Sequence, residues 1–502
     1  MQIKNLSTST SNQVQSSMKN HVIDFFKKYY SIFVILFIGF VGWFFKLTNF
    51  SIVCMAIACM LFFVFTDDPK HLLTALFSFP AFIFSCYEYL PYALSAGITI
   101  FGMVYYTIKM VFVKKIPIRK GKMFWGFVAL TLAFSLGGII GNFRIIYFLI
   151  VFGLCLAGYY TYWLVINFSK DLKNFFNISI ISIGLVLIIQ FLIGHAMLGS
   201  NIFQSIAQKS LHHIGEQNIN NVAVYFGLSM IACLQLAFKN KKDYLYCLFA
   251  VLFAVFVFLT YSRMCTLVAL VLLLVGGVFV YAKSSNKKIF NITFISIFAI
   301  LLCIFVPLII FDKIRIFDWY INLGVKDNGR FDLWSWCLEQ FKSHPIFGIG
   351  MYSEELLPVV HSHKVIADNI FVQYLVSTGI VGSFFALCFY IFKYKVSASH
   401  FNSFKFFNIL SILLIALNGI TSQAPTTDFM MVMISIVLIA LAELDTDSQI
   451  EGKIENKTFK LNQNKSRIVA TDKKNKEKTN LKTNLDKKWK NLSKKKRIHF
   501  ST

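Results

Sequence analysis

Charged residues are scarce in this chain, since Asp, Glu, Lys and Arg make up only 15% of its 502 residues. A water-soluble protein of ordinary composition carries about a quarter. Hydrophobic residues reach 57%, and the mean hydropathy is +0.64. This balance excludes an ordinary soluble enzyme and indicates that lipid is the solvent for most of the chain.

The apolar runs also lack the alternation of polar and apolar residues that marks the strands of a membrane β-barrel. Runs of about 20 apolar residues fit the hydrocarbon core as helices. We therefore predict an all-α polytopic membrane protein with about 12–14 transmembrane helices and one large folded periplasmic or extracellular loop. The predicted spans are 31–46, 49–66, 71–88, 92–113, 123–141, 143–167, 177–198, 220–238, 244–260, 262–282, 290–311, 368–393, 404–420 and 426–443.

Basic residues predict the orientation. The first 20 residues are polar for too long to be a cleavable signal peptide, so we expect the first helix to be retained. Lys and Arg gather in alternating connections, which the positive-inside rule places in the cytoplasm together with both termini. We expect a multi-pass protein of the bacterial cytoplasmic membrane, with its longer outer loops at about 199–219 and 312–367. The basic connections are 114–122, 169–173, 239–242, 283–288 and the segment around Lys393.

Much of the formal net charge of +25 lies in the last 52 residues, 451–502, where Lys and Asn dominate. Such a segment cannot bury enough apolar surface to fold alone, so we predict a disordered cytoplasmic tail close to membrane lipid and no nucleic-acid partner. The predicted parts are a cytoplasmic segment 1–30, a membrane domain 31–311, the large outer loop 312–367, C-terminal helices 368–443 and the basic tail 444–502.

Cysteine is nearly absent from the predicted loops. Only Cys337 lies in the large outer loop, which therefore cannot close an internal disulfide, and no Cys or His cluster has the spacing of zinc ligands. We predict no metal site and no cofactor.

The large outer loop contains the segment RFDLWSWCLEQFKSH at 330–344. Its apolar residues have the spacing of an amphipathic helix that could lie on the membrane surface, and Pro345 marks the end of that helix. Gly348 and Gly350 follow, where the backbone must turn tightly or approach a ligand closely. The predicted apolar face consists of Phe331, Leu333 or Trp334, Leu338 and Phe341.

Three segments, taken together and in this order, resemble the O-antigen ligase and polymerase superfamily. They are LTYSR at 259–263, GRFDLWSWCLEQFKSHPIFGIG at 329–350 and ADNIFVQYLVSTGIVG at 367–382. The resemblance implies an inverting, metal-independent glycosyl transfer from an undecaprenyl-pyrophosphate-linked glycan at the outer face of the cytoplasmic membrane. A flippase and a chain-length regulator are the protein partners it suggests.

In this family the polyprenyl diphosphate of the donor is the leaving group. Arginine is suited to bind it, because the planar guanidinium makes paired hydrogen bonds to phosphate oxygens and keeps its charge. The resemblance assigns this role to Arg263 and Arg330. An interface anchor is the alternative for Arg263, and a loop charge paired with Asp327 or Asp332 is the alternative for Arg330.

The acceptor hydroxyl must lose a proton, and ligases of this family resemble one another in a His-Asn pair before a GxxG motif. Here that position holds Asp368 and Asn369, which favours the polymerase branch. Asp368 is either a base that acts on the acceptor or the N-cap of the following helix. His361 and His363 are alternative bases.

The remaining candidates would bind the substrate. They are Trp334, Gly348, Gly350 and Asn369, with His212, His213 and Asn218 from the smaller outer loop. We therefore predict a Wzy-type polymerase, with an O-antigen ligase as the alternative enzyme. A flippase is the alternative of another class, but the chain shows no convincing internal repeat.

Overall fold

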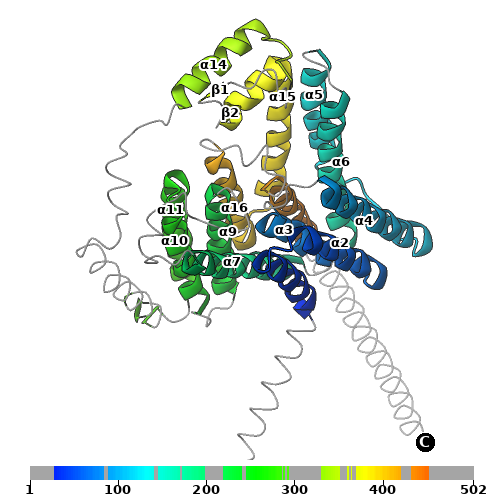
Figure 1. The fold of residues 1–502 in the computed structure, drawn as a ribbon. Helices are drawn as coiled ribbons and strands as arrows, with labels where there is room; N and C mark the ends of the chain where they lie inside the picture. Colours follow the sequence, from blue (N-terminus) through cyan, green and yellow to red (C-terminus); the bar gives the residue numbers. More distant parts are fainter. Residues whose placement is uncertain are drawn as a thin grey trace, which may run out of the picture. The chain divides into compact units, whose positions relative to one another are not determined.

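The computed structural model describes residues 28–83, 89–140, 145–169, 172–197, 219–239, 245–284, 287–288, 291–292, 295, 330–350, 359–360, 363–364, 369–419 and 431–450. The chain divides into two compact units, Met1–Glu443 and Leu444–Thr502. In the second unit the described residues, 444–450, are helical. All the other described residues belong to the first unit (Figure 1).

Helices make up nearly all of the described residues. After a first helix at Lys28–Phe44 come α2 (Thr48–Phe65), α3 (Lys70–Ile83), α4 (Tyr89–Ile108) with a π-helical turn at Lys109–Val113, α5 (Phe124–Ile140), α6 (Ile145–Phe168), α7 (Leu172–Met197), α9 (Ile219–Lys239), α10 (Leu245–Leu259), α11 (Arg263–Lys283), α14 (Arg330–Ser343), α15 (Ile370–Ala398), α16 (Ser403–Asn418) and a helix over 431–450. The two-residue strands β1 (Val359–Val360) and β2 (His363–Lys364) form an antiparallel pair.

Among the described residues, six helices are long and apolar enough to cross a membrane, and four shorter apolar helices accompany them. The prediction of an all-α polytopic membrane protein is thereby confirmed. The predicted spans coincide with helices, except that the span 290–311 lies almost wholly outside the described residues. The six long segments are Thr48–Phe65, Ala93–Val113, Leu172–Met197, Ile219–Lys239, Arg263–Lys283 and Ile370–Ala398.

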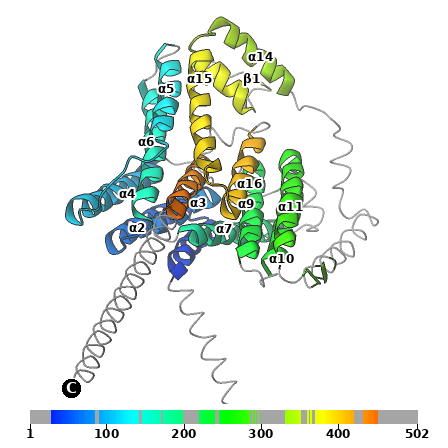
Figure 2. The ribbon, with the colours of Figure 1, turned by 180° about the vertical axis from the view of Figure 1, so that it is seen from behind.

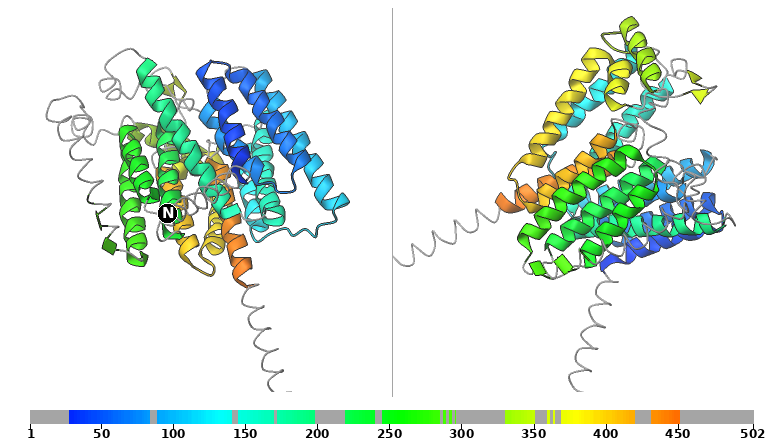
Figure 3. Two further views of the ribbon diagram at one scale, coloured as in Figure 1. Left: turned by 90° about the horizontal axis from the view of Figure 1, so that it is seen from below. Right: turned by 90° about the vertical axis from the view of Figure 1, so that its left-hand side faces the viewer.

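Helix α9 is the most buried of these six, with 89% of its apolar window inside the protein. It packs against α7, α10, α11 and α16 (Figure 3). Small residues bring the helices close, because a Cβ added at Gly184 would lie only 2.3 Å from Oγ of Ser229. That hydroxyl donates to the carbonyl of Ile180 at 2.9 Å, which satisfies a polar group in the helix interface.

Helices α5 and α15 form a second close pair. Ala133, Ile370, Tyr374 and Ala386 are buried between them. Gly382 permits this approach, because an added Cβ would lie 2.9 Å from the carbonyl oxygen of Ala133. This pair carries the beginning of α15, where the family resemblance places its third segment.

The basic connection 114–122 is fixed to neighbouring helices. The backbone N–H of Lys122 donates to the buried carboxylate of Glu443 at 3.2 Å, and the hydroxyl of Tyr162 donates to the same carboxylate. Arg119 and Asn167 exchange two hydrogen bonds, Arg119 N to Oδ1 at 2.8 Å and Nδ2 to Arg119 O at 2.9 Å. The connection is therefore an ordered surface and not a loose loop.

We expect this connection to face the cytoplasm and α14 to lie outside, because the basic residues gather in the former. Cysteine at Lys120, which is exposed, should react with a membrane-impermeant maleimide only after the cells are opened. Cysteine at Phe331, which is 64% exposed, should react in intact cells. The parent protein gives the background from native cysteines, and labelling of Lys120→Cys in intact cells would reverse the assigned orientation.

Candidate functional site

Helix α14 forms where the sequence predicts it, and it ends at Ser343 before Pro345. Its buried face is Leu333 and Cys337, which pack with Ile349 and Val376. Of the predicted apolar face, Leu333 and Phe341 pack in this cluster, whereas Phe331 and Leu338 are 64% and 41% exposed. One flank of the helix docks on α15 (Figure 2), and contact of the exposed flank with the membrane surface stays a prediction.

The docked flank shields the one cysteine of this region. Cys337 is only 3% exposed, and burial raises its pKa to about 11. The thiol therefore stays protonated at neutral pH and reacts slowly. A loss of docking would expose it, which makes Cys337 a native reporter of the α14–α15 contact.

Asn369 is the N-cap of α15. Its Oδ1 accepts hydrogen bonds from the backbone N–H groups of Phe371 at 2.9 Å and Val372 at 3.2 Å. The capping role considered for Asp368 therefore belongs to Asn369, because Asn369 has the extended backbone of a cap and its carbonyl side chain reaches the free N–H groups. Asp368 itself lies outside the described residues.

Gln373 stands one helical turn after Asn369 and was not singled out from the sequence. Its Nε2 donates to Oγ of Ser377 at 2.7 Å. Asn369, Gln373 and Ser377 are thus spaced by four residues along the first part of α15. That spacing is visible in ADNIFVQYLVST and could have marked Gln373 as a polar residue on the same face.

Arg263 is half-buried and is the first residue of α11. The turn before it is conformationally unusual, because the fully buried Tyr261 has a φ of +57°. A non-glycine residue in the left-handed region costs about 1–2 kcal/mol and persists only where its surroundings hold it. Sequence reasoning missed Tyr261, since no local pattern in LTYSR indicates a positive φ.

Arg263 stands at the start of a helix. The N-terminus of a helix carries a partial positive charge from its N–H groups, and the first turn of α11 contains no acidic residue. Arg330 is likewise the first residue of α14, although there Asp332 follows in the first turn, and the side chain of Arg330 is not described.

Helices α11 and α15 begin at the same end of the packed group formed by α11, α15 and α16. Phe279, near the end of α11, stacks on Phe406, near the start of α16, with ring centroids 4.3 Å apart, so the two helices run antiparallel. The end of α16 therefore lies beside the start of α11. There the carbonyl of Gly419 accepts from the N–H of Ile370 at 2.9 Å, which joins the start of α15 to the same end.

The remaining predicted residues are only partly visible. Trp334 is half-buried on α14, and its Nε1 is buried without a hydrogen-bond partner among the described residues. His363 lies in β2, where only the backbone is described. Gly348 and Gly350 have φ values of +71° and +89°, so the backbone turns at both. His361, Asp368, His212, His213 and Asn218 lie outside the described residues.

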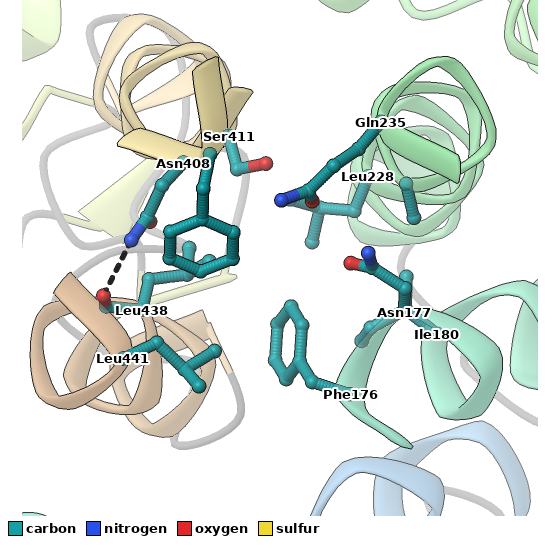
Figure 4. A pocket seen from close by; sticks show the side chains of 11 residues that line it. Phe176, Asn177, Ile180, Leu228, Gln235, Asn408, Ser411, Leu438 and Leu441 are labelled. Atoms are coloured by element: carbon teal, nitrogen blue, oxygen red, sulfur yellow. Dashed lines mark hydrogen bonds between the residues drawn. The ribbon is translucent and has the colours of Figure 1, made fainter. Parts of the chain in front are cut away.

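A narrow pocket lies among α7, α9 and α16, toward the end where α16 begins (Figure 4). Most of its lining is apolar, and Asn177, Gln235, Asn408 and Ser411 add amide and hydroxyl groups. It lies away from α14 and is not part of the candidate site.

The comparison with known families gives a match to the part of the chain that contains α10, α11, α14 and the first part of α15. Residues 248–387 match the model of the family described as O-antigen ligase. Over this segment the chain is similar to the O-antigen ligase family. The resemblance to the O-antigen ligase and polymerase superfamily is thereby confirmed. A search of curated proteins finds no match to the chain.

Two replacements of Asn369 separate its role as N-cap from any role of its amide group. We expect Asn369→Ala to lower the free energy of unfolding by about 1 kcal/mol, while Asn369→Asp keeps the cap and restores stability. Thermal unfolding of the purified protein in detergent measures this. Asn402→Ala is the matched control, because Asn402 caps α16 at the opposite end by accepting from Lys405 N at 2.9 Å. Equal losses for Ala and Asp at position 369 would contradict the capping role.

Proposed function

We propose that the protein is a polysaccharide polymerase. It would transfer a growing glycan from its undecaprenyl-diphosphate carrier to a new lipid-linked repeat unit at the outer face of the cytoplasmic membrane. The match of residues 248–387 to the O-antigen ligase family supports glycosyl transfer of the ligase or polymerase kind in general. The apolar helices support a multi-pass membrane protein. The choice of polymerase rests on Asp368 and Asn369 standing where the ligases have a His-Asn pair.

The observation that carries the proposal is the place of Arg263 as first residue of α11, with no acidic residue in that turn. In this transfer, negative charge grows on the departing diphosphate. A guanidinium and the N–H groups of a helix start would both stabilise that charge. Arg330 would supply a second cation from the start of α14.

The acceptor sugar would bind near the start of α15. Because Asn369 supplies the cap, a carboxylate at position 368 is not required for capping and is available as the base that takes the hydroxyl proton. Gln373 lies one turn further along and could bind a neighbouring sugar hydroxyl through its amide oxygen. His361 or His363 is the alternative base.

The ligase remains the second candidate function, because the family that matches residues 248–387 is described as O-antigen ligase. The two activities share the donor and differ in the acceptor. In either case we propose a flippase that delivers the donor as partner, and for a polymerase a chain-length regulator as well.

We expect Arg263→Ala and Arg330→Ala each to lower polymer formation about 100- to 1,000-fold, the range for removing one preorganised donor from a developing anion. Lysine at either position should restore only part of the activity, because an ammonium group lacks the paired fork. The surface glycan of a strain deleted for the native gene, run on a gel, measures chain length. Arg119→Ala is the control, since Arg119 bonds the end of α6 in the connection 114–122.

The gel distinguishes the candidate functions. Single repeat units in both arginine variants, with the protein present in the membrane, support a polymerase. Long polymer that stays on its lipid carrier supports the ligase. Unchanged glycan in both variants would refute the assignment of the arginines to the diphosphate.

A further inference from the structure

The two glycine-containing motifs, FGIG and STGIVG, lie in contact with each other. Helix α15 is kinked at Gly379, which has φ 65° and ψ −167°. Side-chain-bearing residues essentially never adopt this combination, so the kink requires glycine. The loop Pro345–Gly350 lies against the kink. We call these two segments, Pro345–Gly350 and Val376–Val381, the glycine junction.

A kink interrupts the hydrogen bonds of a helix and leaves backbone groups without partners on both sides of it. The loop supplies those partners. Carbonyls of Pro345 and Ile346 accept from Ile380 N at 2.9 Å and Val381 N at 3.1 Å. On the other side of the kink, the N–H groups of Ile349 and Gly350 donate to the carbonyls of Val376 and Ser377, both at 2.9 Å.

The two backbones approach too closely for any side chain at the contact. A Cβ added at Gly379 would lie 2.4 Å from the carbonyl oxygen of Ile346, and one added at Gly348 would lie 2.5 Å from the carbonyl carbon of Ser377. The obstacles are backbone atoms, so no rotation of a side chain can relieve them. Any larger residue must push the loop away from α15.

The junction has consequences at the site because the loop follows directly on α14. Leu333 and Cys337 of α14 pack on Val376, which is itself part of the junction. We infer that Gly348 and Gly379 are positioning residues: they fix α14 against the first part of α15 and so set Arg330 relative to Asn369. This inference rests on the proposed function for the roles of Arg330 and Asn369.

Gly379→Ala tests the inference. The Ile346 carbonyl would have to move by about 1 Å, and a shift of this size in a catalytic arrangement lowers a rate about 100-fold. We expect kcat per folded molecule to fall by that factor, with a change in KM for the donor of less than about tenfold. Lipid-linked repeat units extracted from cells that lack the protein serve as substrate.

Cys337 gives a second readout that does not depend on activity. It should resist a membrane-impermeant maleimide in the parent protein and become reactive in Gly379→Ala, because α14 loses its docking. Cys337→Ser in the same background shows that the label is at this residue. Gly277→Ala is the control for both readouts, since a Cβ added there meets no atom within 4 Å.

Two further variants keep the test decisive. Val376→Ala removes a buried side chain from the docking surface and leaves the backbone unchanged, so it should give partial labelling and a smaller loss of kcat even where Gly379→Ala fails to accumulate. We expect Gly348→Asn to lose as much kcat as Gly348→Ala. Asparagine tolerates a positive φ, but its Cβ would still meet Ser377.

Labelling of Cys337 without a loss of kcat would overturn the positioning role, and a loss of kcat without labelling would overturn the junction as its cause. Failure of the proposed function has a different signature. In that case the Arg263 and Arg330 variants would make normal polymer, whatever the labelling shows.

Discussion

The backbone hydrogen bonds of the glycine junction are the constraint on which the candidate site depends. A helix that enters lipid must satisfy its own N–H and C=O groups, and a kink is stable only where another segment satisfies those it releases. Here the loop after α14 does so, with two acceptors and two donors. The same bonds that make the kink possible therefore fix the position of α14. The bend of α15 and the position of α14 are thus coupled through this junction.

The two ends of the helices differ in how they hold charge. At one end Arg263 begins α11, and the first turn of that helix contains no acidic residue. At the other end charged groups meet partners: Glu443 binds the N–H of Lys122, and hydrogen bonds from Lys114 and Lys109 lower the pKa of Asp67.

The sequence predicted the membrane helices because apolar runs and basic breaks are local signals, and α14 because its spacing is periodic. It did not predict which face of α14 is buried, since that depends on the distant Val376. Gly379 looks ordinary in STGIVG, and its kink is intelligible only beside Ile346, more than 30 residues earlier. Tyr261 was missed for the same reason, because its left-handed backbone is held by tertiary contacts. Local periodicity and the tight turns at Gly348 and Gly350 could be read from the sequence, and the distant segment that the loop contacts could not.

The cap on α15 bears on how the transfer would proceed under the proposed function. Since Asn369 is the N-cap, a carboxylate at position 368 is not needed for capping and would serve as the base. A carboxylate is ordinarily a weaker base than a histidine, and it would remove the acceptor proton late, as the new glycosidic bond forms. Most of the barrier would then have to be lowered at the leaving group. The arginine side of the site, and with it the position of α14, would therefore matter more to this protein than the identity of its base.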